Sequence, residues 1–178
     1  MGWKNLKEHF KIEHIVQVTQ KGICIGSGYV HDLATIDPTT GTVRENPTFR
    51  DFLREHYPAL LESEPAEIAR LINAPDSFSA SITVYTYDGG NIIEKQCEAL
   101  GWPNVTHDGE VMYENQFSAD LATVVAWAKR SADLGIRYGE ESVEEIKQQL
   151  ADCCSRLEGE RVNRAKLEAQ YPTEAPNV

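Results

Sequence analysis

The last third of the chain carries a narrow apolar repeat inside an otherwise charged segment. From residue 140 to 169 the composition is dominated by Glu, Lys, Arg, Gln, Ala and Leu. Apolar residues recur there at spacings of three and four until Glu160 and Arg164 interrupt the repeat. The repeat consists of Val143, Ile146, Leu150, Cys153 and Leu157. A helix with one narrow apolar stripe must bury it against a partner, so we expect an oligomer interface here or a helix that folds back on its own chain.

Residues 14–45 show the alternation that is typical of short β-strands. Isoleucine, valine and threonine alternate around turns rich in glycine and proline, which predicts an antiparallel meander. Gly26 and Gly28 interrupt one of these strands, a pattern typical of a bulge or of close approach by another backbone. A further strand at 82–87 is expected to join the same sheet.

The regions around the meander predict helices and a second hairpin. Thr48 and Asp51 resemble a capping pair before a first helix, and Pro65 suits the first turn of a second. Asp108-Gly109 predicts a tight hairpin. The expected class is therefore α+β, with a small antiparallel sheet, helices packed on one of its faces and a long C-terminal helix.

The same patterns predict how the chain is divided. Helical spacing resumes after Ser118, but Gly135 and Gly139 weaken its continuation. We therefore expect a compact α+β domain at 1–139, a long charged helix at 140–171 and a frayed tail at 172–178.

The stretch YTYDGGNIIEKQCEALG, residues 85–101, predicts a strand, a glycine turn and a short helix. Asn91 is a favourable N-cap, and Glu94 lies three residues later, where its carboxylate can reach the N–H of the cap. The N-terminus of such a helix could hold an anion, but these two side chains could equally satisfy the free N–H groups. Nearby tyrosines could sandwich a base or fill a core. The candidate ligand-binding residues are Gly89, Gly90, Asn91, Lys95, Tyr85, Tyr87 and Tyr113.

No stretch carries a specific catalytic signature. The histidine spacings of metal sites and the Gly-x-Ser-x-Gly of serine hydrolases are absent, so we expect no catalytic residue, no metal and no cofactor. A dispersed site built from His31, Asp32, His107 and Asp108 across two hairpins is the remaining enzymatic hypothesis. Cysteines at 24, 97, 153 and 154 do not form a disulfide framework, which favours reduced thiols in the cytoplasm.

Charge limits the class of partner. Acidic residues outnumber basic ones 28 to 17, for a net charge of −11, so the chain repels nucleic acid backbone and anionic membrane. No apolar stretch approaches the length of about 20 residues that a membrane helix needs, and the N-terminus lacks a secretory signal. A basic protein surface, a divalent cation or simple solubility could each explain the negative charge.

Two stretches carry a resemblance to a known group of proteins. Residues 101–115, GWPNVTHDGEVMYEN, and residues 14–33, HIVQVTQKGICIGSGYVHDL, together with the charged terminal helix, resemble uncharacterised small acidic proteins of tailed bacteriophages. The resemblance assigns no activity to any named residue. It implies a context, the cytoplasm of a host cell, in which such proteins bind a host protein or sequester a host small molecule, sometimes to blunt a defence system.

These observations favour one function and leave two others open. We expect a non-enzymatic accessory binding protein, phage-encoded and homo-oligomeric, that inhibits or sequesters a host component through its acidic surface. The first alternative is an oligomeric sponge that holds a nucleotide or another anionic metabolite near Gly89, Gly90, Asn91 and Lys95. The second is an enzyme with the dispersed site named above.

Overall fold

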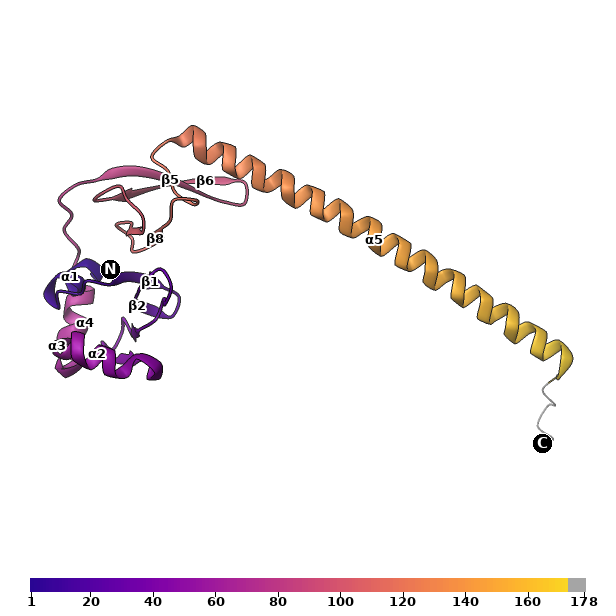
Figure 1. The fold of residues 1–178 in the computed structure, drawn as a ribbon, viewed down its shortest axis with the longest axis horizontal. Helices are drawn as coiled ribbons and strands as arrows, with labels where there is room; N and C mark the ends of the chain where they lie inside the picture. The colour runs from indigo at the N-terminus through magenta and orange to yellow at the C-terminus, as the bar shows by residue number, and fades with distance from the viewer. Residues whose placement is uncertain (173–178) are drawn as a thin grey trace. The chain divides into compact units, whose positions relative to one another are not determined.

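The structure, a computed structural model, describes residues 1–172. The chain divides into a compact unit, residues 1–128, and a second unit that begins at residue 129. Antiparallel sheets and short helices make up most of the first unit, and a long helix forms the second (Figure 1). The expected α+β class is confirmed.

A four-stranded antiparallel sheet opens the fold, in the order β1-β2-β3-β4. Its strands are β1 (Ile15–Thr19), β2 (Gly22–Gly26), β3 (Ala34–Ile36) and β4 (Val43–Glu45). The predicted meander is confirmed, and so is the close backbone approach at one of its glycines. A Cβ on Gly26 would lie 2.4 Å from the carbonyl oxygens of Val30 and His31, whereas a Cβ on Gly28 would have no atom of residues 1–172 within 4 Å apart from its chain neighbours.

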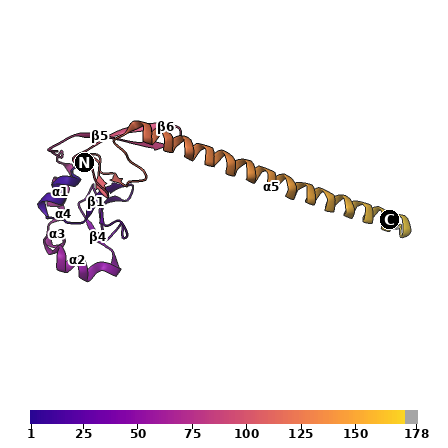
Figure 2. The same cartoon turned by 45° about the horizontal axis from the view of Figure 1, so that its top comes forward.

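Short helices cover one face of this sheet (Figures 1 and 2). They are α1 (Trp3–His9), the 3-10 helix η1 (Pro47–Phe49), α2 (Arg50–His56), α3 (Pro58–Glu62) and α4 (Pro65–Asn73). The first predicted cap is wrong, because the side chain of Asn46 accepts the N–H of Thr48 at the start of η1. Pro65 stands in the first turn of α4, as predicted.

Alternation along β2 separates the core from the polar face of the sheet. Ile23 and Ile25 are fully buried against the helices, among Leu6, Leu53, Leu60, Ile68 and Ile72. Cys24, between them, points to the other face, where its sulfur lies 3.4 Å from the hydroxyl of Thr19. The helices therefore cover one side of the sheet and leave a hydroxyl- and thiol-bearing side facing away.

Two hairpins follow, and one of them differs from its prediction. β5 (Ile82–Asp88) pairs with β6 (Asn91–Cys97) in a separate two-stranded sheet, with Asp88 opposite Asn91. The predicted helix at 91–100 is therefore wrong, and β5 does not join the meander. Seven paired positions and the β-branched Ile92 and Ile93 outweigh the local capping signal. β7 (Asn104–Val105) and β8 (Val111–Met112) form the second hairpin as predicted.

A small second core holds these hairpins together. It consists of Val84, Cys97, Met112 and Phe117, all with 1% or less of their surface exposed, with Ile82 packed against it. Backbone bridges join Tyr85 to Ser118 and Cys97 to Thr106. Cys97 is buried on β6, and all four cysteines are free.

The long helix α5 (Leu121–Gln170) is continuous. Asp120 starts it, because its carboxylate accepts the N–H groups of Ala122 and Thr123. The expected weakening at Gly135 and Gly139 does not occur, since about 1 kcal/mol per glycine is small against a helix of this length. The predicted boundary at 139 therefore falls inside a helix, and of the predicted tail only Pro172 lies within the described residues.

Candidate functional site

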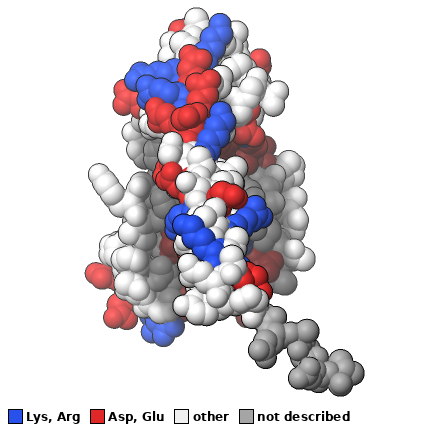
Figure 3. Space-filling model, turned by 90° about the vertical axis from the view of Figure 1, so that its right-hand side faces the viewer, with Lys and Arg blue, Asp and Glu red and all other residues white. Residues whose placement is uncertain are grey.

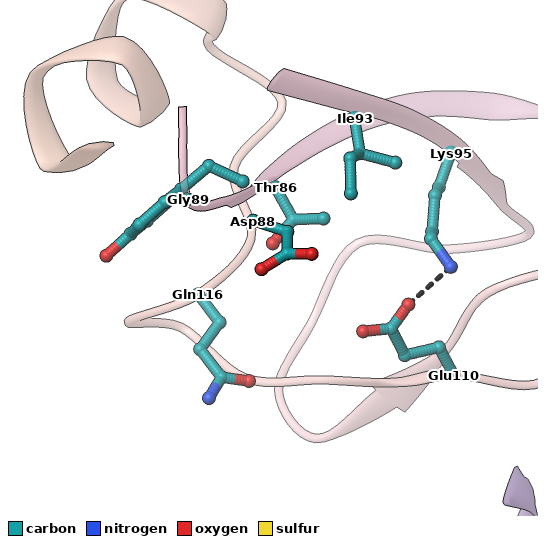
Figure 4. Close-up of a pocket in the computed structure, with 8 residues that line it drawn as sticks. Thr86, Asp88, Gly89, Ile93, Lys95, Glu110 and Gln116 are labelled. Carbon is teal, nitrogen blue, oxygen red and sulfur yellow. Dashed lines mark ion pairs between the residues drawn. The ribbon is translucent and has the colours of Figure 1, made fainter. Parts of the chain in front are cut away.

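A hollow of about 610 Å³ lies beside the β5–β6 hairpin (Figure 4). Three segments of the compact unit supply its walls: the hairpin, the strand region at 110 and the loop that precedes α5. The lining residues are Thr86, Tyr87, Asp88, Gly89, Ile93, Lys95, Glu110 and Gln116.

Lys95 is the cation of this hollow, and carboxylates already neutralise it. Its ammonium group pairs with Glu110 and lies 2.6 Å from a carboxylate oxygen of Asp108. Burial lowers the pKa of Lys95, but these two partners more than offset burial, so the pKa stands above its ordinary value. The same contacts hold the pKa of Asp108 below its ordinary value despite partial burial. Lys95 therefore stays charged and paired.

Asp88 adds a carboxylate that is not neutralised. Its side chain is exposed and, among residues 1–172, has neither a hydrogen-bond nor an ion-pair partner. Figure 4 shows Asp88, Glu110 and Gln116 directed into the same space. Among the residues that the structure describes, two carboxylates and one ammonium group line the hollow, and Asp108 also pairs with that ammonium, so the hollow has a negative balance. It suits a cationic group better than an anion.

The structure brings together part of the predicted ligand site. Tyr87, Gly89 and Lys95 line the hollow, and sequence reasoning missed Asp88, Glu110 and Gln116. Gly90 and Asn91 complete the turn and are not among the described residues that line the hollow. Tyr85 exchanges backbone hydrogen bonds with Ser118, and Tyr113 lies beside Trp102 at a different hollow.

The glycine turn reverses the chain and aims no helix at an anion. Gly89 has a positive φ of 55°, and Asp88 and Asn91 pair directly across the two glycines. A helix N-terminus at Asn91 was the basis for the predicted anion site, and residues 91–97 are a strand instead.

A second hollow, of about 690 Å³, lies on the polar face of the four-stranded sheet. Cys24, His31, Asp32 and the half-buried Asn46 line it, and Lys21 balances the charge of Asp32. Tyr29 stands at its rim with 98% of its surface exposed. The remaining lining residues are Gln17, Thr19, Gln20, Val30 and Phe49. This hollow is neutral in balance and rich in hydrogen-bonding groups.

The structure does not assemble the dispersed histidine site. His31 and Asp32 line the second hollow, whereas His107 stacks on Phe78, with ring centroids 3.7 Å apart, and Asp108 pairs with Lys95. Within residues 1–172 no group of three His, Cys, Asp or Glu side chains is placed to hold a metal ion.

The negative charge belongs almost entirely to the compact unit. Residues 1–128 hold 18 acidic and nine basic side chains, while residues 129–172 hold nine acidic and eight basic ones. On the face drawn in Figure 3, basic side chains lie among acidic ones. The excess of acidic side chains therefore lies on the compact unit, and the helix from residue 129 is nearly neutral.

The predicted stripe is solvent-exposed along α5. Val143, Ile146, Leu150 and Leu157 have 52 to 63% of their surface exposed, and Cys153 is also exposed. Large apolar side chains that are exposed at regular spacing are typical of a protein–protein interface. Among the described residues, none of the helices combines the length and apolarity needed to cross a membrane.

Comparison of the chain with protein-family models, with curated proteins and with solved structures finds no match.

Proposed function

We propose that this chain is a non-enzymatic binding protein whose compact unit captures a basic segment of a partner protein at the hollow beside the β5–β6 hairpin. One observation carries the proposal: Lys95 is already paired with Asp108 and Glu110, while the carboxylate of Asp88 has no partner among residues 1–172. A lysine or arginine side chain that enters the hollow gains this carboxylate. The excess of acidic side chains on the same unit would steer a basic surface toward it.

The resemblance to small acidic phage proteins supplies the proposed context. A protein of this kind would be made in the cytoplasm of a bacterial host and would inhibit or sequester a host component. In some cases that component would belong to a defence system. The negative field of the compact unit supports a partner with a basic surface over one that presents phosphates.

The test is binding of a fluorescent oligolysine peptide to the wild type and to two matched variants. Asp88→Asn removes the unpartnered carboxylate, and Glu94→Gln removes one charge from the same hairpin outside the hollow. We expect Asp88→Asn to weaken binding about three- to fivefold and Glu94→Gln to change it little, because one partly exposed ion pair contributes up to about 1 kcal/mol. Equal effects of the two variants would leave only a diffuse field and reject the hollow as the site.

A small-molecule sponge remains a second candidate, favoured by the hollow on the polar face of the sheet. This second hollow is neutral in balance and is lined by amide, hydroxyl and tyrosine groups. These groups suit a planar polar ligand. Protein purified from host cells and then denatured would release a ligand that absorbs ultraviolet light. If folded protein purified in this way releases no ultraviolet-absorbing ligand on denaturation, the sponge hypothesis is rejected.

We also infer that the chain self-associates through the exposed stripe of α5. Leu150→Glu places a charge in the stripe, and Val162→Glu places the same charge at an exposed apolar residue of the same helix outside it. Sedimentation should show a dimer for the wild type and for Val162→Glu, and a monomer for Leu150→Glu. A wild type that is monomeric at every concentration tested would reject self-association.

A further inference from the structure

Because α5 is continuous, the heptad spacing of the apolar stripe can be followed beyond the stripe itself, through positions that are apolar, small or charged. Spacings of three and four continue backward from Val143 through Gly139, Ile136, Ala132 and Lys129, and forward from Leu157 through Glu160. From residue 129 to 160 this is a heptad seam of about four and a half heptads, enough for a coiled coil. In heptad terms, position a is held by Lys129, Ile136, Val143, Leu150 and Leu157, and position d by Ala132, Gly139, Ile146, Cys153 and Glu160.

A parallel pair of these helices would be poorly matched. In that arrangement every position faces its own copy. Lys129 would face Lys129, Glu160 would face Glu160, and Gly139 would face Gly139, leaving a gap in the middle of the seam. Both ends of the seam would then carry like charges in contact, which destabilises pairing.

An antiparallel pair turns the same positions into complementary layers, because each a residue then faces a d residue of the second copy. Setting Val143 opposite Ile146 of the second copy fixes all the others. Lys129 then faces Glu160 of the second copy, so the charges at the ends of the seam attract. Leu150 faces Gly139 of the second copy and Leu157 faces Ala132 of the second copy, so each large side chain meets a small one.

The rim of the seam fits the same register. Lys147 and Glu140 flank the core at position e, and in the antiparallel register Lys147 lies beside Glu140 of the second copy. All of these side chains are exposed in the single chain. The ammonium nitrogen of Lys147 lies 3.5 Å from a carboxylate oxygen of Glu144 in its own chain. Because this is a weak surface ion pair, the same ammonium group can also pair with Glu140 of the second copy.

We propose that residues 129–160 of α5 pair antiparallel with the same residues of a second copy, with Val143 opposite Ile146 and Lys129 opposite Glu160. This proposal rests on the self-association inferred above and adds the direction and the register of the pair. A second copy is the occupant of the stripe because the charges and side-chain sizes of the stripe complement themselves only in this direction.

Charge exchange tests the direction. Lys129→Glu and Glu160→Lys each replace two attractive contacts of the dimer by two repulsive ones, so each should weaken dimerisation about tenfold in sedimentation at low salt. The double variant, Lys129→Glu with Glu160→Lys, restores attraction and should return the dissociation constant to within about threefold of the wild type. A parallel pair would not show this loss and recovery of dimerisation, because every one of these variants keeps like charges in contact. Matching far-ultraviolet circular dichroism controls for helix content.

A cysteine test reads the register independently. In a Cys154→Ser background, Ile136→Cys should form an intermolecular disulfide with the native Cys153 of the second copy under mild oxidation. Without that substitution Cys153 faces Ile136 and should remain reduced. A dimer whose double charge variant stays weak, or that links rapidly through Cys153 to Cys153, overturns the antiparallel pair. A monomeric wild type overturns self-association itself, so the two failures are distinguishable.

Discussion

The ammonium nitrogen of Lys95 lies 2.6 Å from a carboxylate oxygen of Asp108. Lys95 belongs to β6 and Asp108 to the loop between β7 and β8, so this contact ties the two hairpins together. The lysine has only 17% of its side chain exposed, whereas the two carboxylates that it serves are about half exposed. The negative balance of the hollow that Lys95 lines therefore depends on a lysine whose ammonium group is already paired.

Removing that lysine should strengthen the capture of cations. In Lys95→Met the carboxylates of Asp108 and Glu110 lose their partner, so the hollow gains negative charge. We expect oligolysine to bind about three- to tenfold tighter at low salt, with a modest loss of stability of about 1 kcal/mol. Fluorescence anisotropy across a salt series measures the first, and urea unfolding the second. Weaker binding of oligolysine by this variant would contradict the proposed role of the hollow.

Acid should weaken the fold through Glu98. A hydrogen bond from Lys4 lowers the pKa of Glu98 to about 2, from an ordinary value of 4.5, and joins α1 to the end of β6. A carboxyl group with a depressed pKa stabilises the folded state above its unfolded pKa, and this contribution is lost as the pH falls from about 4.5 toward 2. Urea unfolding of the wild type and of Glu98→Gln at several pH values should show a gap at pH 7 that closes progressively below pH 4.5. A gap that stays constant down to pH 3 would show that the contact does not depend on the charge of Glu98.

Gly26 and Gly28 should differ in how much stability they lose on the same substitution. A Cβ on Gly26 would lie 2.4 Å from two carbonyl oxygens, so Gly26→Ala must shift the backbone and should cost about 2 kcal/mol. Apart from its chain neighbours, a Cβ on Gly28 has none of the described residues within 4 Å, so Gly28→Ala should change stability by less than about 0.5 kcal/mol. Thermal unfolding of both variants provides the comparison, and similar losses would contradict the packing at β2.

Truncation of Phe117 tests the second core separately. Phe117 has 1% of its surface exposed and packs with Val84, Cys97 and Met112. Phe117→Ala should destabilise the compact unit by about 3 to 5 kcal/mol, because it leaves a cavity under the hairpins. Phe117→Leu should cost less. Chemical unfolding measures both, and a loss below about 1 kcal/mol for the alanine variant would mean that the hairpins do not depend on this core.

Features that depend on local sequence could be predicted. The meander and the Asp108-Gly109 hairpin follow from alternation and turn residues within short windows. The helix expected after Asn91 failed for the opposite reason. Its capping signal is local, but the strand that replaces it is set by pairing of seven positions with β5, which a short window does not contain.

The site could be predicted only in part. Tyr87, Gly89 and Lys95 are close in sequence and were expected near one another. Glu110 and Gln116 reach the hollow only because the second hairpin folds against the first, and no short sequence pattern reveals that packing. Lys95 was expected to bind a ligand, but in the structure it pairs with Asp108 and Glu110. These acidic partners come from a separate hairpin, so a short stretch of sequence around Lys95 does not contain them.

The length of α5 has a consequence for what two copies could do together. Each helical residue advances the chain by about 1.5 Å, so residues 129 of two chains paired in the proposed register stand about 47 Å apart along the rod. A pair of this kind would carry two copies of the proposed capture site, one on each chain. Against a target that repeats its basic patch at a suitable interval, the second contact is intramolecular, and modest single-site affinity becomes durable attachment through avidity.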